Sequence, residues 1–330
     1  MVPVSLKEIA RICEVSPSTI SRILSGKNPK CASEAVKARV WAVAKEMNYL
    51  PNQNARLLKT AAEEAAAPTV GIAFSRMRDA YSNHFFQTLI QSISEEALRR
   101  GCPAPKTLYV EDYLQSPPKP DKKAGLVVLG RCSEQRLREL VRSFPSLICV
   151  GLNPYAPVCD QVICNGRTAA EMAMQHLLDK GHLRIGYVGE CENEVRYLGY
   201  RSMLIDRGIP FDQALVYNTS QSLEGGRRAA KRILDTADSP SALFCANDAT
   251  AIGVLSELQA LAPEMPRPAV ISIDNIDQAQ EKHLQLTTIH IPIQEMGAMA
   301  VKLLLDRIGK GHASPIRVEF PCNLVRRQSS

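Results

Sequence analysis

The chain has 330 residues, of which 45% are hydrophobic and 22% are charged, a balance that is ordinary for globular proteins and excludes a disordered or fibrous chain. This length exceeds what one hydrophobic core needs, so we expect a small domain joined to one or two larger ones. No apolar run is long enough to span a bilayer, and the segment MVPVSLKEIA lacks the pattern of a signal peptide, so we expect a cytoplasmic protein with no membrane attachment.

The positive charge lies at one end of the chain. Residues 1–60, here called the head, contain ten Lys or Arg and four acidic residues, whereas residues 61–330, the body, contain 30 of each. A small basic unit joined to a neutral one indicates that the head binds a polyanion and that the body has another task.

Three short helices are predicted in the head. The motif SLKE, which begins at Ser5, is a capping box and starts the first helix, whose pattern breaks at Glu14. Ser16 caps a second helix from Pro17 to Leu24, where a proline at the first position costs no hydrogen bond. Ser33 caps a third helix that ends near residues 48–49.

The segments SLKEIARICEVSPSTISRIL and YLPNQNARLLKT, which together span residues 4–60, closely resemble the DNA-binding head of the LacI/GalR family of bacterial transcriptional repressors. The resemblance implies that the second helix enters the major groove and reads base edges with its N-terminal end. By position it assigns DNA contacts to Ser16, Pro17, Ser18, Thr19, Ser21 and Arg22. Arg22 would then pair with a guanine; the alternative is a solvated surface charge.

Residues 52–58 are predicted as a hinge helix that is too short to be stable alone. In the family this hinge folds when two copies meet over the operator, and its Leu wedges between base pairs in the minor groove. The resemblance assigns the wedge to Leu58 and further DNA contacts to Asn52, Ala55, Arg56 and Lys59. The alternative is that Leu57 and Leu58 pack on the body, which suits Leu57 better.

Glu14 departs from the family pattern, which usually has glycine at this turn position. A non-glycine residue at positive φ costs about 1 kcal/mol, which leaves room for a turn of different shape.

The body alternates short Val- and Ile-rich runs with helical patterns. Predicted strands are TVGIAF, GLVVLG, SLICVG, QVIC, RIGYVG, ALFCAN, AVISID and TTIHI, and predicted helices cover about 84–100, the stretch through residue 140, 169–178 and 294–308. This rhythm predicts parallel sheets flanked by helices, in two lobes because one sheet would be too wide. We therefore expect an N-lobe of about 69–163 and 292–320 and a C-lobe of about 164–291 and 321–330.

The body also resembles this family and the periplasmic sugar-binding proteins, through the motifs SNHFFQTLIQSI, KGHLRIGYVG, VRYLGYR, CANDATAIGVL, SIDNID and LTTIHIPIQEMG. The fold implied is a small all-α helix-turn-helix domain followed by an α/β core of two parallel-sheet lobes with a ligand cleft between them. By motif position the effector-binding residues are Arg196, Asn247 and Asp274 as hydrogen-bonding groups, with Phe85 or Phe86 as an apolar wall.

Several other residues have structural interpretations. Asn247 and Asp248 precede a helical pattern and are candidate helix caps, a role that we favour for Asp248. His182 and His290 are interpreted as structural residues. The pocket departs from better-known family members at Gly151, where some relatives carry Asp, and near residues 220–221, where the nearest aromatic residue is Tyr217.

Ten cysteines are scattered singly, without a C-x-x-C pair or a histidine at ligand spacing. We interpret them as buried apolar side chains and expect no metal, no cofactor and no disulfide framework.

These patterns predict a homodimeric, sequence-specific transcriptional repressor that binds a near-palindromic operator and responds to a small-molecule effector, a mono- or disaccharide. The SRMRDAYSNHFF and DQVICNGRTAA segments look most like the branch that controls galactoside use. A sugar-binding transport protein is the alternative. An enzyme is the third hypothesis, but G-x-S-x-G, P-loop and G-x-G-x-x-G signatures are missing and no catalytic residues are predicted.

Overall fold

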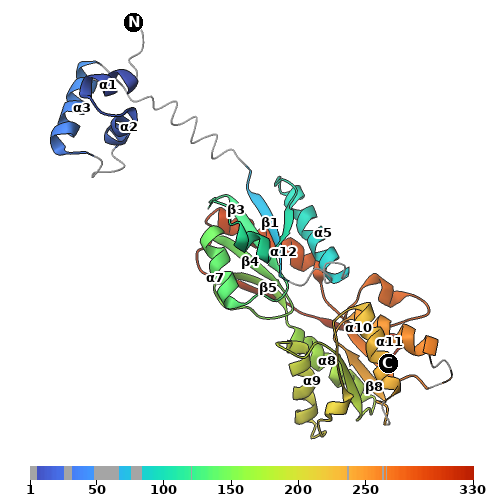
Figure 1. Ribbon diagram of the computed structural model, residues 1–330. Coiled ribbons are helices and arrows are strands. Elements are labelled where there is room, and N and C mark those ends of the chain that lie inside the picture. The colour runs from blue at the N-terminus through green and yellow to red at the C-terminus, as the bar shows by residue number, and fades with distance from the viewer. Residues whose placement is uncertain are drawn as a thin grey trace. The chain divides into compact units, whose positions relative to one another are not determined.

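The structure is a computed structural model of the chain, and it describes residues 6–25, 32–47, 67–75, 84–119, 121–235, 238–261, 264 and 266–330. The chain divides into two compact units, Met1–Ala66 and Ala67–Ser330 (Figure 1). Among the described helices, none combines the length and the apolar character that crossing a membrane requires.

The first unit contains the three helices predicted for the head: α1 (Leu6–Cys13), α2 (Pro17–Ser25) and α3 (Glu34–Glu46). Two of the predicted caps are confirmed, because the Oγ of Ser16 accepts a hydrogen bond from the Thr19 amide at 3.1 Å and the Oγ of Ser33 accepts one from Val36 at 3.4 Å. The helices enclose a small core of Ile9, Ala10, Cys13, Ile20, Ile23, Val40 and Ala44.

The turn between α1 and α2 has the geometry that favours glycine. Glu14 has a φ of 55°, and the amide of Val15 donates to the carbonyl of Ala10 at 3.1 Å. This is the backbone pattern of a Schellman motif, with Glu14 at the left-handed position. Glu14 therefore accepts the strain of this position, and the turn keeps the shape that a glycine would allow.

The described residues of the second unit form two six-stranded sheets. Sheet A has the strand order β11-β5-β4-β3-β1-β2 and is parallel throughout, as predicted. Its strands are β1 (Thr69–Phe74), β2 (Lys106–Tyr109), β3 (Ala124–Leu129), β4 (Ser146–Gly151), β5 (Asp160–Cys164) and β11 (Arg317–Phe320). We call the lobe built on this sheet the N-lobe.

Sheet B has the order β12-β10-β9-β8-β6-β7 and carries the C-lobe. Its strands are β6 (Ile185–Gly189), β7 (Val216–Asn218), β8 (Ala242–Cys245), β9 (Ala269–Asp274), β10 (Thr287–His290) and β12 (Asn323–Val325). β12 pairs antiparallel with β10, which the prediction of parallel sheets missed. The chain leaves β11 at the joint between the lobes and enters sheet B directly, so β12 runs antiparallel to β10, its single neighbour in the sheet.

Helices cover both faces of each sheet. In the N-lobe, α5 (His84–Arg99) and α12 (Ile293–Ile308) pack on one face, and α6 (Val110–Gln115) and α7 (Glu134–Ser143) pack on the other. In the C-lobe, α8 (Gly166–Asp179) and α9 (Val195–Asp206) lie opposite α10 (Leu223–Leu234) and α11 (Asp248–Leu261). Short 3-10 helices occupy Gln213–Leu215 and Asp277–Gln280.

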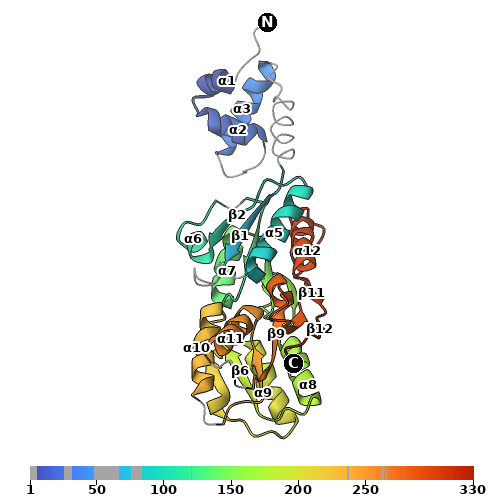
Figure 2. The same ribbon diagram turned by 90° about the vertical axis from the view of Figure 1, so that its right-hand side faces the viewer.

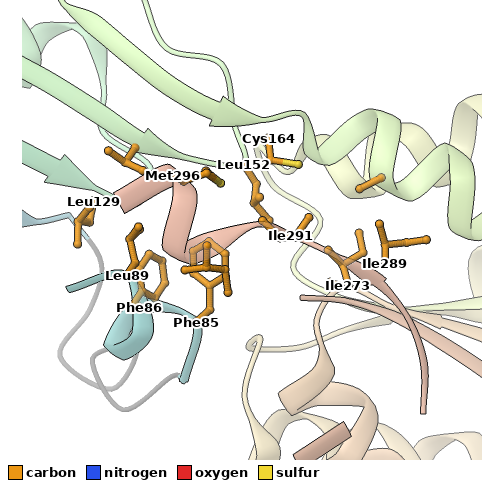
Figure 3. Close-up of a cluster of buried hydrophobic side chains, with 14 of the residues drawn as sticks. Phe85, Phe86, Leu89, Leu129, Leu152, Cys164, Ile273, Ile289, Ile291 and Met296 are labelled. Atoms are coloured by element: carbon orange, nitrogen blue, oxygen red, sulfur yellow. The ribbon is translucent and has the colours of Figure 1, made fainter. Parts of the chain in front are cut away.

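Within the described part of the body, the chain crosses between the sheets three times: between β5 and α8, between β10 and α12, and between β11 and β12. Figure 2 shows β11 and β12 following one another along one side of the body, across this joint. One hydrophobic cluster continues through the joint, where Leu152, Cys164 and Ile291 lie near one another (Figure 3). The lobes are therefore connected by covalent crossovers and by a shared core.

Candidate functional site

A cavity that opens to solvent lies between the two lobes, and its roughly 450 Å³ of empty space includes open solvent. Its lining residues follow or end parallel strands of both sheets, which is where ligands bind in open α/β folds. All five residues predicted for the effector site line it. The full lining is Phe85, Phe86, Gly130, Arg131, Gly151, Leu152, Asn153, Tyr155, Arg196, Gln221, Asn247 and Asp274.

Arg196 is held in the cavity wall by a two-pronged ion pair. Its Nε donates to Glu194 Oε1 and its Nη2 to Glu194 Oε2, both at 2.8 Å. The Arg196 side chain is 6% exposed and that of Glu194 is fully buried. Burial raises the pKa of Glu194, but the charge and hydrogen bonds of Arg196 outweigh this and lower it to about 2. The pair therefore stays ionised at neutral pH.

Gln221 and Asn247 extend this network. Arg196 Nη2 donates to Gln221 Oε1 at 2.7 Å, and Gln221 Nε2 donates to Glu194 Oε2 at 2.8 Å. Asn247 Nδ2 donates to the Gln221 carbonyl at 3.3 Å. Gln221 therefore fills the region where the sequence showed no aromatic residue, and Tyr217 is buried in the separate core beneath α10 and α11.

The cap of α11 is Asn247, and the prediction that Asp248 is the cap was wrong. Asn247 Oδ1 accepts from the Thr250 amide at 3.0 Å, three residues ahead, whereas Asp248 is the first residue of the helix. The carboxylate of Asp248 instead accepts from Ser272 Oγ at 2.5 Å, Thr288 Oγ1 at 2.6 Å and the Ile276 amide at 2.8 Å. It joins α11 to β9 and β10.

Asp274 differs from these neighbours because one of its carboxylate oxygens has no partner. It is 3% exposed, its Oδ1 accepts no hydrogen bond, and its φ is 128°. Burial and the Asp248 charge raise the pKa of Asp274 well above its usual value, against the opposing charge of Arg196. Asn153 Oδ1, which is also buried, lacks a partner as well. The cavity thus presents two buried acceptors that a ligand with donors would satisfy.

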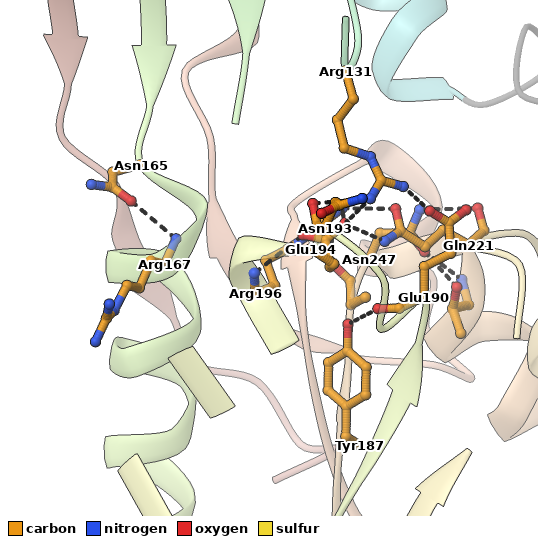
Figure 4. A network of polar contacts seen from close by, with 12 residues as sticks. Arg131, Asn165, Arg167, Tyr187, Glu190, Asn193, Glu194, Arg196, Gln221 and Asn247 are labelled. Atoms are coloured by element: carbon orange, nitrogen blue, oxygen red, sulfur yellow. Dashed lines mark hydrogen bonds and ion pairs between the residues drawn. The ribbon is translucent and has the colours of Figure 1, made fainter. Parts of the chain in front are cut away.

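Arg131 reaches across the cavity from the N-lobe to the C-lobe, and sequence reasoning missed it. It follows β3 and pairs through Nη2 with the carboxylate of Glu190. Its Nη1 donates to the carbonyls of Glu192 at 2.8 Å and Asn193 at 3.2 Å (Figure 4). Its position one residue after the GLVVLG run was the only available signal.

The N-lobe wall is aromatic. Phe85 and Phe86 meet edge to face at 5.2 Å between ring centroids, and both are buried. Tyr155 Oη donates to the carbonyl of Gly130 at 2.8 Å. A Cβ atom on Gly151 would lie only 2.8 Å from the same hydroxyl oxygen of Tyr155. Tyr155 therefore occupies the space that a side chain at Gly151 would need.

The predicted DNA-binding residues extend from Ser16, which caps α2, to Arg22 in the last turn of that helix. Ser16, Pro17, Ser18 and Arg22 are exposed, and Ser16 Oγ lies 2.7 Å from Ser18 Oγ and 2.8 Å from Thr19 Oγ1. Ser21 belongs to α2. The hinge residues Asn52, Ala55, Arg56, Leu58 and Lys59 lie outside the described residues, so their roles remain predictions.

Both histidines interpreted as structural have partners: His182 Nδ1 lies 3.1 Å from Ser241 Oγ, and His290 Nδ1 lies 3.2 Å from Asn275 Nδ2. Across the described ranges, no group of three or more His, Cys, Asp or Glu side chains is arranged to hold a metal ion.

Comparison with known proteins agrees with this architecture. The family model "Bacterial regulatory proteins, lacI family" matches residues 5–52, and the model "Periplasmic binding protein-like domain" matches residues 174–330. The chain is 28% identical to the ribose operon repressor of Escherichia coli K12, over 99% of both chains. It is 26% identical to the transcriptional repressor PurR of Aliivibrio salmonicida, over 98% of both.

A solved LacI-family transcriptional regulator from Enterococcus faecium with bound ribose is also similar, with a TM-score of 0.67 and 25% identity over 79% of this chain and 98% of that one. A helix-turn-helix head joined to a two-lobe body defines a DNA-binding transcriptional regulator and not an enzyme. The chain carries a LacI-family DNA-binding domain and a periplasmic-binding-protein-like domain, and the relatives that match its full length are transcriptional repressors.

Proposed function

We propose that this protein is a homodimeric, cytoplasmic repressor whose affinity for a near-palindromic operator is controlled by an uncharged sugar bound between its lobes. The observation that carries this proposal is the cavity in which Arg196, Asn247 and Asp274 converge on the cleft side of sheet B, with two buried acceptor oxygens unsatisfied. The ribose operon repressor and the ribose-bound regulator among its relatives support a sugar effector.

The charges of the cavity favour a neutral ligand. Arg196 forms an ion pair with Glu194, and Arg131 forms one with Glu190. The positive charge of each guanidinium is therefore already balanced by a carboxylate of the protein. Asp274 adds acceptor oxygens without a matching cation of its own. A phosphate or carboxylate on the ligand would face carboxylates, whereas hydroxyl groups would donate to Asp274 and Asn153.

The shape of the cavity favours a ring with one apolar face. Phe85 and Phe86 form a buried hydrocarbon wall on the N-lobe side, and the C-lobe side is lined by polar groups. A pyranose or furanose ring offers C–H groups on one face and hydroxyls around its edge. Such a ligand would contact both lobes at once and stabilise one arrangement of them.

The operator response would follow from that arrangement. In a dimer, the relative position of the two bodies determines whether both heads can bind adjacent half-sites of the operator at the same time. A sugar that binds one arrangement of the lobes more tightly than the other shifts this equilibrium by its difference in affinity. The basic head supplies the electrostatic part of operator binding.

The proposal is tested by thermal-shift titration of the full-length protein with ribose, sucrose, cellobiose and galactosides, together with their phosphorylated forms. A neutral sugar should raise the melting temperature in a concentration-dependent manner, and its phosphate ester should not. An operator selected from random duplexes should then bind with an affinity that the same sugar changes. Absence of any selected duplex would contradict the DNA-binding part, and stabilisation by a phosphate ester alone would contradict the effector class.

The control is Asp274→Asn, which removes the carboxylate and keeps its shape. It should abolish the sugar-induced shift and leave operator binding without sugar intact. A normal shift in this variant would remove Asp274 from the site.

A further inference from the structure

Two cysteines meet where the chain crosses between the lobes. Cys164 is the last residue of β5, and Cys322 lies between β11 and β12. Phe320, two residues before Cys322, is the direct partner of Cys164 in sheet A. The Cys164 side chain belongs to the core that runs through the joint (Figure 3). Cys322 packs against that core. Two of the three crossovers therefore bring a thiol to the same point.

We propose that Cys164 and Cys322 form a reversible oxidation site, a disulfide that ties two lobe crossovers together and couples the regulator to peroxide. Cys322 packs against the core cluster that contains Cys164, and each thiol is the main hydrogen-bonding partner of the other. This inference goes beyond the proposed sugar response, because it concerns a second input at the hinge.

The two thiols differ in the way that a stepwise oxidation requires. Cys322 is only half-buried, and its hydrogen bond with Cys164 lowers its pKa to about 7. Cys164 is fully buried, and that same hydrogen bond, followed by burial, raises its pKa. Cys322 is therefore the thiol that a peroxide can reach and acts as the nucleophile, whereas the buried Cys164 is the resolving thiol.

A hydroperoxide is the oxidant that converts the two thiols into a disulfide. The Cys322 thiolate attacks one oxygen of the hydroperoxide, the O–O bond breaks, and the leaving alkoxide or hydroxide takes up a proton. The resulting sulfenic acid is attacked by the Cys164 sulfur, which loses its proton as the S–S bond forms and water departs. Both sulfurs together give up two electrons, and the hydroperoxide accepts them.

A disulfide at this place would restrict the motion of the lobes. Hinge closure in two-lobe proteins is absorbed by a few residues in the connecting segments. A covalent link between the crossover after β5 and the crossover after β11 leaves only the segment between β10 and α12 unconstrained. The oxidised protein should therefore hold one lobe arrangement whether or not the cavity is occupied.

The chain contains a matched control pair. Cys149 and Cys159 lie 3.4 Å apart between their Sγ atoms, but both are buried. Burial raises the pKa of Cys149 well above its usual value. This pair has proximity without a solvent-accessible thiolate, so it should remain reduced in the folded protein.

The experiment treats the full-length protein with hydrogen peroxide at neutral pH, blocks free thiols, and identifies disulfide-linked peptides by mass spectrometry. The Cys164–Cys322 linkage should form at least about tenfold faster than any Cys149–Cys159 linkage and should be reversed by dithiothreitol. Cys322→Ser, at a half-buried position, should abolish the linkage, and Cys149→Ser should not affect it. Equal oxidation of both pairs, or oxidation of neither, would overturn the proposal.

The hinge consequence is measured separately. Operator affinity of the oxidised and reduced wild-type protein is titrated with and without the sugar found by thermal shift, with Cys322→Ser as the peroxide-insensitive control. The oxidised wild type should lose the sugar-dependent change in affinity. If the disulfide forms and that change persists, the restriction of the hinge is wrong although the oxidation site stands; if no operator is found, only the proposed function fails.

Discussion

Two buried carboxylates, one in each lobe, differ in how their oxygens are satisfied. Asp160, at the start of β5 in the N-lobe, accepts from Arg307 Nε at 2.5 Å and Nη2 at 2.6 Å, from His312 Nε2 at 2.9 Å and from the Ile316 amide at 2.8 Å. Asp274, at the end of β9 in the C-lobe, leaves one oxygen without a partner. A protein rarely leaves a buried acceptor unsatisfied without a functional reason. The difference therefore indicates that Asp160 stabilises the fold and that Asp274 is available to a ligand.

The largest effect should come from breaking the N-lobe pair. Arg307→Ala leaves the fully buried Asp160 without its main partner, and removal of one member of a buried ion pair costs about 3–5 kcal/mol. Urea denaturation should show this loss in the free energy of unfolding. Arg317→Ala removes an exposed pair with Glu319 within β11, the strand beside β5, and should change the free energy of unfolding by less than about 1 kcal/mol. Equal effects would show that the Asp160 site is not structural.

The same substitution should have opposite effects at the two carboxylates. Asp160→Asn loses charged hydrogen bonds to Arg307 and should destabilise the protein by about 1–3 kcal/mol. Asp274→Asn removes a charge that burial and Asp248 disfavour, and asparagine tolerates positive φ better, so it should stabilise the sugar-free protein. Thermal unfolding at pH 8 compares the two variants.

The stability difference between Asp274→Asn and the wild type should depend on pH. The folded-state pKa of Asp274 is raised, so its charge costs stability above the unfolded pKa, and this cost disappears as the pH falls. The advantage of Asp274→Asn should therefore shrink toward pH 4. An advantage that is independent of pH would mean that backbone strain, and not charge, is relieved.

Much of the fold, and part of the candidate site, could be predicted from the sequence. Capping residues and apolar spacing predicted the three head helices, and the alternation of strands and helices predicted two parallel-sheet lobes. Motif positions selected five residues that all line one cavity. The four edge strands β2, β7, β11 and β12 and the short α6 were missed, because three to six residues carry too little periodicity.

The remaining parts of the site depend on loop geometry. Glu194, Gln221 and Tyr155 acquire their contacts only when distant segments meet, and no spacing in the sequence indicates that they do. The first residue of α11 could not be predicted from the sequence to within one residue. That one-residue difference decides whether Asn247 or Asp248 is the cap. The effector-binding roles predicted for Phe85, Phe86, Arg196, Asn247 and Asp274 remain predictions.

A smaller effect should appear in the pH dependence of the N-lobe site. The hydrogen bond to Asp306, together with that to Asp160, raises the pKa of His312. The stability contributed by the protonated ring is fully present below the unfolded pKa of about 6.5 and is lost as the pH rises through the folded pKa. The melting temperature should therefore fall between pH 6 and pH 9 more in the wild type than in His312→Asn. Parallel curves for the two proteins would show that the ring carries no charge in this site.

The smallest effect should come from the contact that joins the two lobes across the cavity. Arg131 and Glu190 are both partly exposed, at 25% and 31%, so their coupling energy in a double-mutant cycle should be about 1 kcal/mol or less. Because this contact connects an N-lobe strand end to a C-lobe loop, Arg131→Ala should also increase the rate at which a bound sugar dissociates, measured by stopped-flow fluorescence. Arg138→Ala, which removes an exposed pair with Glu134 within α7 alone, is the matched control and should leave that rate unchanged. A rate that responds equally to both variants would reduce the Arg131 contact to ordinary surface charge, and the cavity would then be closed by the packing of the lobes alone.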